Sequence, residues 1–101
     1  MENPELHYAS TVILVRDSAN GLEILLQERS GKSESFSGAF VFPGGKVDLH
    51  DADKEYENLY SGHTDKDASN ILGVPKYGLA YWMGGIREVF EEAGILLAYD
   101  K

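Results

Sequence analysis

A chain of 101 residues is long enough for one small domain at most, which buries only about two-thirds of the surface that its unfolded form exposes. A formal charge of −8 without a cluster of Lys or Arg argues against nucleic acid or an anionic membrane as a partner. The absence of cysteine excludes disulfides, and the acidic amino terminus lacks the apolar segment of an export signal. We therefore expect a cytoplasmic chain that binds neither nucleic acid nor a membrane.

The first part of the chain predicts an antiparallel hairpin. Largely apolar and β-branched residues run from Tyr8 to Val15, which is typical of a strand buried on both faces. The pair Asn20-Gly21 favours a tight turn with positive φ, and a second apolar run extends over residues 22–28. A third, short strand is expected at residues 39–42.

The motif Pro43-Gly44-Gly45 is expected to end the third strand in a sharp turn. Proline lacks a backbone donor, and glycine permits backbone conformations that other residues resist. The two glycines allow either of two interpretations. They let a backbone group approach a ligand or metal without an intervening Cβ, or they serve a tight turn only.

Residues 48–67 are predicted to form a surface excursion. The segment holds seven acidic residues and two lysines, and few of its side chains are apolar. A short helical turn could pack against the rest of the domain through Tyr56, Leu59 and Tyr60. Residues 49–74 are expected to form a peripheral insertion that contributes little to the core, so that a short linker could replace them without loss of the sheet and the long helix.

A long helix is predicted to begin near residues 76–79, after Pro75, and to end at Gly94. Two glycines, Gly84 and Gly85, lie inside it at a cost of about 1 kcal/mol each relative to alanine. They leave room for a bound group or allow close packing against a neighbouring loop. The expected core side of the helix carries Leu79, Trp82, Met83, Ile86, Phe90 and Ala93.

On the other side of this helix, Glu88, Glu91 and Glu92 stand at positions i, i+3 and i+4 and share one face. Carboxylate oxygens without Cys or His suit Mg²⁺, Mn²⁺ or Ca²⁺. The alternative is a solvated acidic face on which Arg87 and Glu91 form an ordinary i, i+4 ion pair.

Two stretches together resemble the signature of Nudix hydrolases: residues 42–48, Phe-Pro-Gly-Gly-Lys-Val-Asp, and residues 87–95, Arg-Glu-Val-Phe-Glu-Glu-Ala-Gly-Ile. The second half of the signature is matched in full. In the first half, Asp51 stands where the family usually has Glu, and thirty-five residues separate it from Arg87 instead of seven. The chain therefore resembles a subgroup with an insertion in the signature, expected here at about residues 49–75.

A further resemblance, to coenzyme A diphosphatases, lies in residues 25–30, Leu-Leu-Gln-Glu-Arg-Ser, followed by Gly38 and Gly44-Gly45 at the same spacing. Gln27 departs from the usual Thr, and Glu34 departs from the usual basic residue. Coenzyme A or an acyl derivative is the substrate that this pattern suggests, with other nucleoside diphosphate derivatives as alternatives.

The Nudix resemblance implies an α/β fold, an α/β/α sandwich around a mixed sheet. Because Nudix domains continue past this helix, residues 1–101 are expected to be the amino-terminal part of a single domain, truncated after the helix. A missing carboxy-terminal segment or a second copy would complete it, and the piece alone is expected to be inactive.

The same resemblance implies a hydrolase that cleaves the pyrophosphate linkage of a small nucleoside diphosphate derivative with Mg²⁺ or Mn²⁺. The alternative is a non-catalytic Nudix-like module that binds a nucleotide or a protein. The resemblance assigns metal binding to Glu88, Glu91 and Glu92 and to the carbonyl of Gly45. It assigns catalysis to Arg87 and Glu88, and substrate binding to Arg29, Gly44 and Gly45.

Overall fold

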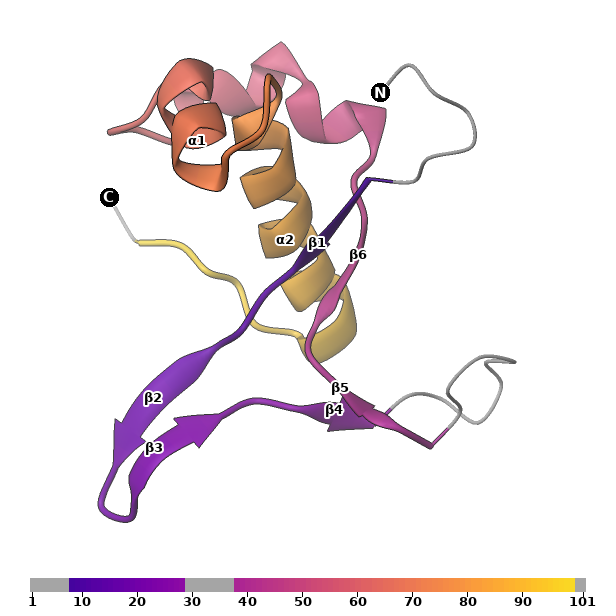
Figure 1. The fold of residues 1–101 in the computed structure, drawn as a ribbon, viewed down its shortest axis with the longest axis vertical. Coiled ribbons are helices and arrows are strands. Elements are labelled where there is room, and N and C mark those ends of the chain that lie inside the picture. Colours follow the sequence, from indigo (N-terminus) through magenta and orange to yellow (C-terminus); the bar gives the residue numbers. More distant parts are fainter. Residues whose placement is uncertain (1–7, 29–37, 100–101) are drawn as a thin grey trace.

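The computed structural model describes residues 8–28 and 38–99. In Figure 1 the strands form a long ribbon that passes α2, and α1 gathers with two short helices near the start of α2. The elements in chain order are the strands β1 (Ala9–Thr11), β2 (Val15–Ser18), β3 (Gly21–Ile24), β4 (Gln27–Glu28), β5 (Phe40–Val41) and β6 (Gly44–Lys46), the 3-10 helices η1 (Leu49–Ala52) and η2 (Lys54–Asn58), and the α-helices α1 (Asp65–Leu72) and α2 (Gly78–Ala93).

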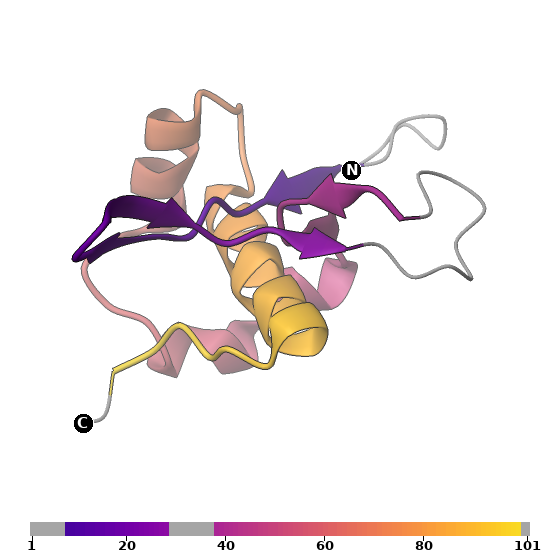
Figure 2. The same cartoon turned by 90° about the horizontal axis from the view of Figure 1, so that it is seen from below.

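The predicted hairpin is confirmed. Strands β2 and β3 pair antiparallel with Ser18 opposite Gly21, and Gly21 has the positive φ of 103° that the turn requires. Figure 2 shows the hairpin projecting beyond α2. The first strand is not buried on both faces, as Ile13 and Val15 are each 56% exposed. This prediction is wrong because, among the described residues, helices pack against one side of the strands only.

The expected sharp turn at Pro43-Gly44-Gly45 is also wrong. Residues Gly44–Lys46 form β6, which pairs antiparallel with β1 so that Ser10 lies opposite Gly45. A Cβ on Gly44 would lie 2.3 Å from the carbonyl oxygen of Ser10. The missing side chain therefore lets two backbones approach closely, and the glycines here serve a strand rather than a turn.

Helix α2 is confirmed, whereas α1 was not predicted. Thr64 and Asp67 form a capping box at the start of α1, and Gly73 ends it in the left-handed conformation with φ 74°. Ala68 and Ser69 of α1 are buried. The described side chains of residues 48–67 are largely exposed apart from Asp51, as expected of a surface excursion, and the segment leads into a helix that packs on α2. The replacement of residues 49–74 by a short linker stays a prediction.

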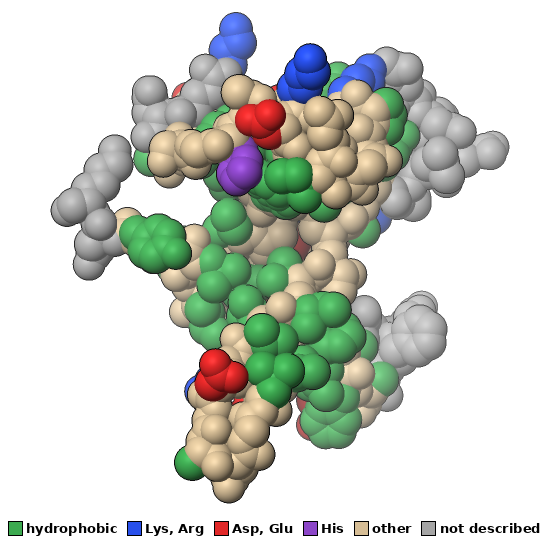
Figure 3. All heavy atoms as spheres, turned by 60° about the vertical axis from the view of Figure 1, so that its left-hand side comes forward, with side chains coloured by type: hydrophobic (Ala, Val, Ile, Leu, Met, Phe, Trp, Pro, Cys, Tyr) green, Lys and Arg blue, Asp and Glu red, His purple; other side chains and the backbone are tan. Residues whose placement is uncertain are grey.

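The side of α2 that packs inward carries small residues. Gly84 and Gly85 face Asp51 and Val12, and Val89 is fully buried. The predicted core side is wrong in part, since Phe90 is 53% exposed. Figure 3 shows hydrophobic side chains gathered over a broad area of the surface. In the part of the chain that the structure describes, no helix has both the length and the apolar character to cross a membrane.

Candidate active site at Arg87

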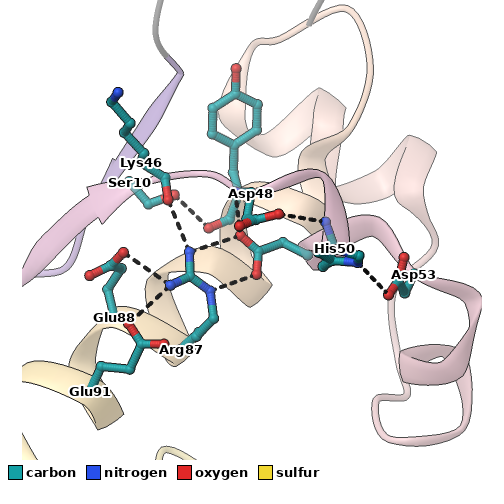
Figure 4. A network of polar contacts seen from close by, with 10 residues as sticks. Ser10, Lys46, Asp48, His50, Asp53, Arg87, Glu88 and Glu91 are labelled. Atoms are coloured by element: carbon teal, nitrogen blue, oxygen red, sulfur yellow. Dashed lines mark hydrogen bonds and ion pairs between the residues drawn. The ribbon is translucent and has the colours of Figure 1, made fainter.

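The guanidinium of Arg87 organises the carboxyl half of α2. It joins α2 to η1 through Asp51, with Nε–Oδ1 at 2.9 Å and Nη2–Oδ2 at 3.1 Å. Nη2 also donates to the carbonyl oxygen of Lys46 at the end of β6, at 2.9 Å. Figure 4 shows this network between the helix and the strand. The hydrogen bond with Asp51 raises the pKa of Arg87 above its usual value. Arg87 is therefore a fixed cation at the junction of three elements.

Asp51 is the buried partner in this network. Its side chain is 1% exposed, against 27% for that of Arg87. One carboxylate oxygen also accepts from the backbone N–H of Asp48 at 2.7 Å, which completes a capping box at the start of η1. A buried carboxylate needs such compensation, since desolvation costs several kcal/mol per ion. The sequence left the role of Asp51 open, and the structure makes it the anchor of Arg87.

Glu88 and Glu91 both accept from the remaining guanidinium nitrogen of Arg87. Nη1 donates to Oε1 of Glu88 and to Oε2 of Glu91, each at 3.1 Å. The Arg87–Glu91 contact is the i, i+4 pair that the sequence offered as an alternative. It is one branch of a larger network, since Arg87 also binds Glu88 and Asp51. The side-chain positions are seen in Figure 4.

Gly45 and Gly44 bring β6 against the carboxylates. A Cβ on Gly45 would lie 2.6 Å from the carboxylate carbon of Glu88, so the space that glycine leaves is taken by that carboxylate. The N–H of Gly44 donates to Oε2 of Glu92 at 3.2 Å. The strand thus contacts two of the predicted metal ligands. These contacts are with carboxylates of the chain itself, so the approach of the glycine backbone to a ligand or metal stays a prediction.

A hollow of about 680 Å³ opens beside this contact. It is lined by β1, β4, part of β5 and β6, together with Phe42 and Glu92. Its volume lies within the range of small-molecule sites, which is about 300 to 1,000 Å³. Arg29, which was predicted to bind substrate, follows β4 but lies outside the described residues. Glu34 lies outside them as well.

The chemistry of the donor set fits a hard divalent cation, because Glu88, Glu91 and Glu92 supply carboxylate oxygens along one side of α2. Within residues 8–28 and 38–99, however, no three His, Cys, Asp or Glu side chains lie close enough together to hold a metal ion. Arg87 draws two of the carboxylates, and Glu92 accepts from the backbone of Gly44. To hold one ion jointly, the carboxylates have to leave these partners in part.

Comparison with solved structures assigns the fold. The chain matches the crystal structure of a NUDIX hydrolase from Alicyclobacillus acidocaldarius with a TM-score of 0.65 and 28% identity. The match covers 91% of this chain and 38% of that one. The fold is therefore the Nudix fold, as the signature predicted. No protein-family model matches the chain.

Among individual proteins, the chain resembles acyl-coenzyme A diphosphatase NUDT19. It is 29% identical to the Xenopus laevis protein over 106 residues, which cover 85% of this chain and 28% of that protein. It is 28% identical to the Homo sapiens protein over 102 residues, which cover 78% of this chain and 27% of that protein. The chain thus spans less than a third of the length of these relatives. The predicted likeness to Nudix proteins of the coenzyme A diphosphatase type is confirmed.

Proposed function

We propose that the chain supplies the metal-binding half of a hydrolase that cleaves the pyrophosphate linkage of a nucleoside diphosphate derivative. The observation that carries the proposal is the meeting of α2 and β6, where Glu88 lies against Gly45 and Glu92 accepts from Gly44. A diphosphate placed in the adjoining hollow would lie beside these carboxylates. Glu88, Glu91 and Glu92 would hold Mg²⁺ or Mn²⁺, with the carbonyl of Gly45 as a further ligand.

Each residue then has a defined task. A bound divalent ion supplies neutralisation of phosphate charge and a lower pKa for a coordinated water. Arg87 orients Glu88 and Glu91 and is itself held by Asp51. Gly44 and Gly45 line the hollow and would contact the substrate through their backbone groups. We propose Glu88 as the general base, because its carboxylate is partly buried within the Arg87 network.

Coenzyme A or acyl-coenzyme A is the substrate that we propose. The support is the spacing of residues 25–45 and the similarity to acyl-coenzyme A diphosphatase NUDT19. Cleavage at the pyrophosphate would yield a phosphopantetheine half and an adenosine 3′,5′-bisphosphate half. Dinucleotide polyphosphates, nucleotide sugars and nicotinamide dinucleotides share the diphosphate and are the competing substrates. We propose a cytoplasmic site of action.

One observation favours a second candidate, a Nudix-like binding module without catalysis. Glu88 and Glu91 are paired with Arg87 instead of converging with Glu92 on one point. A module of this kind would bind a nucleotide or a protein partner and would have no use for all three carboxylates as metal ligands. The two candidates differ in one measurable property, the turnover of a diphosphate substrate that depends on divalent ions.

The test compares Glu91→Gln and Glu92→Gln with unsubstituted protein, in the complete protein that carries this chain. Both changes remove a carboxylate ligand and one charge of a repelling cluster, so we expect loss of turnover with unchanged or slightly higher stability. Glu23→Gln, on β3 and paired with Arg16, serves as a matched control. Full Mg²⁺-dependent activity in both variants would refute the proposed metal site.

The substrate is tested with the same protein and a panel of diphosphates in Mg²⁺ or Mn²⁺. We expect the highest kcat/KM for coenzyme A or its acyl derivatives. A competing substrate that is hydrolysed about tenfold more efficiently, a transition-state preference of about 1.4 kcal/mol, would rule out the coenzyme A assignment. The absence of divalent-dependent hydrolysis with every substrate would favour the binding module.

A further inference from the structure

The amino-terminal end of α2 is capped by side chains of α1. Tyr77, the residue before α2, has a left-handed backbone with φ 68° and supplies no side-chain cap. Instead, the N–H groups of Tyr77 and Leu79 donate to the two oxygens of Asp65, at 3.2 and 3.1 Å. The N–H of Gly78 donates to Oγ of Ser69 at 2.9 Å. Three consecutive N–H groups, which a helix start leaves unsatisfied, are therefore bound by another helix.

The two helices are also in direct backbone contact at this point. A Cβ on Gly78 would lie 2.2 Å from the backbone nitrogen of Ser69 and 2.4 Å from the carbonyl carbon of Ala68. Ala68 and Ser69 are 0% and 4% exposed. The hydrogen bonds to Asp65 and Ser69 therefore lie where the two helices are closely packed, so that α2 must follow a displacement of α1.

Along its middle, α2 meets the strands through small groups. Gly84 and Gly85 face the sheet and η1, and Oγ of Ser10 donates to the carbonyl oxygen of Tyr81 at 2.6 Å. Glycines supply no side chains that interlock with a neighbour, so contacts near the two ends determine how the helix tilts. The Arg87–Asp51 pair holds the carboxyl half of the helix, six residues before its last residue. Asp65 and Ser69 hold the amino-terminal end.

A small tilt is enough to matter for catalysis. With a rise of 1.5 Å per residue, Glu92 lies roughly 11 Å along the axis from the glycine pair, so a tilt of about 5° moves it by roughly 1 Å. Misplacement of a catalytic group by about 1 Å can cost about 100-fold in rate. The contacts at the start of α2 are therefore placed to control the carboxylates near its end.

We propose that Asp65 and Ser69 are positioning residues of the diphosphate site, and that α1 in the insertion acts by fixing the tilt of α2. This inference rests on the proposed function for its kinetic consequence, whereas its structural part stands on the contacts alone. Neither residue contacts the hollow beside Gly44, so neither is a catalytic residue.

The test is Asp65→Asn in the complete protein, because an amide offers one acceptor oxygen where the carboxylate offers two. Asp67→Asn is the matched control. Asp67 lies in the same turn of α1 and loses the same charge, but its carboxylate accepts from Thr64 of its own helix cap. We expect Asp65→Asn to lower kcat about tenfold at saturating Mg²⁺ and leave KM within about threefold, as the substrate pocket is untouched. Asp67→Asn should stay within about twofold in both.

Hydrogen exchange supplies a readout independent of activity. In Asp65→Asn we expect faster exchange of amides from Ile86 to Ala93 as well as in the first turn of α2, and no such change in Asp67→Asn. Acceleration confined to residues 77–81 would mean a local cap only and would overturn the proposal. Equal losses of kcat in both variants would also overturn it, because they would reflect the stability of α1.

The two proposals fail in different ways. If the unsubstituted protein hydrolyses no diphosphate, the proposed function is refuted, and the exchange comparison still decides whether α1 holds the carboxylate end of α2. If the unsubstituted protein is active and Asp65→Asn keeps its kcat, the positioning role is refuted and the proposed function stands. Ser69→Ala, which removes the acceptor of the Gly78 N–H, provides a second variant with the same expected direction.

Discussion

The two sides of α2 differ in how completely this chain covers them and pairs their polar groups. The side toward β6, η1 and α1 packs through glycines and is held by paired polar groups, and no buried side-chain nitrogen or oxygen among the described residues lacks a hydrogen-bond partner. On the other side Phe90 is 53% exposed, and Leu96, which follows the helix, is 63% exposed. The contacts that shape the candidate site are thus formed within this chain, whereas its apolar side lacks cover.

We propose that residues 1–101 are the amino-terminal part of a single Nudix domain whose open apolar side is covered by a further segment or a second copy. A sheet of an α/β protein carries helices on both faces, and here the described helices cover one. A groove of about 490 Å³ between β1, α1 and α2 is also lined largely by apolar side chains, among them Trp82, Ile86 and Leu97. The predictions below test this difference between the two sides.

The largest effect is expected from the isolated chain. With its apolar side exposed, the 101-residue piece should not persist as a stable, cooperatively folded monomer. Light scattering combined with a thermal melt checks this, with the complete protein as the reference. A cooperative monomer would show that the exposed apolar side needs no cover.

Phe90→Ala in the complete protein tests whether a further segment or a second copy covers the apolar side of α2. If a further segment or copy buries Phe90, the substitution should lower the free energy of unfolding by about 3 to 5 kcal/mol, measured by urea denaturation. Leu79→Ala, at a half-buried position of the same helix, is the comparison. A change below about 0.5 kcal/mol at Phe90, typical of a surface substitution, would mean that this side stays in water.

Asp51→Ala tests the side of α2 whose polar groups are paired within this chain. Removing the buried carboxylate leaves the Arg87 guanidinium without its main partner, and we expect a loss of about 3 kcal/mol in the free energy of unfolding. Glu23→Ala breaks the exposed Arg16–Glu23 pair and should cost no more than about 1 kcal/mol. Equal effects of the two substitutions would contradict the anchoring role of Asp51.

Neighbouring glycines of β6 should respond differently to alanine. A Cβ on Gly44 meets the backbone of Ser10, which cannot move aside, so Gly44→Ala should destabilise by about 1 to 3 kcal/mol. A Cβ on Gly45 meets the end of the Glu88 side chain, which can rotate away. Gly45→Ala should therefore reduce activity with a smaller change in stability. Loss of stability alone at both positions would separate Gly45 from the candidate site.

The hairpin and α2 could be predicted because their signals are local. Asn20-Gly21 specifies a turn within four residues, and the spacing of Glu88, Glu91 and Glu92 places three carboxylates on one helix face. The capping box and the terminal glycine of α1 were equally local signals, and they would have identified that helix.

The remaining features depend on partners distant in sequence. Gly44 lies in a strand because the backbone of β1 comes to it, and Gly-Gly by itself favours a turn. Asp51 is buried because Arg87 reaches it across the insertion, a contact 36 residues apart in the chain. Phe90 was assigned to the core from periodicity alone, which cannot tell whether the apolar side of a helix is covered within the same chain.

The bond from Ser10 to the carbonyl of Tyr81 spans 71 residues, and it bears on the order of folding. Closing so long a loop carries a high entropic cost, whereas α1 and α2 are neighbours in sequence and can meet early. We therefore expect the pair of helices to form first and β1 to dock last, so that the site is assembled in the final step. Pulse-labelled exchange during refolding should show protection of α2 before that of β1, and the reverse order would contradict this sequence of events.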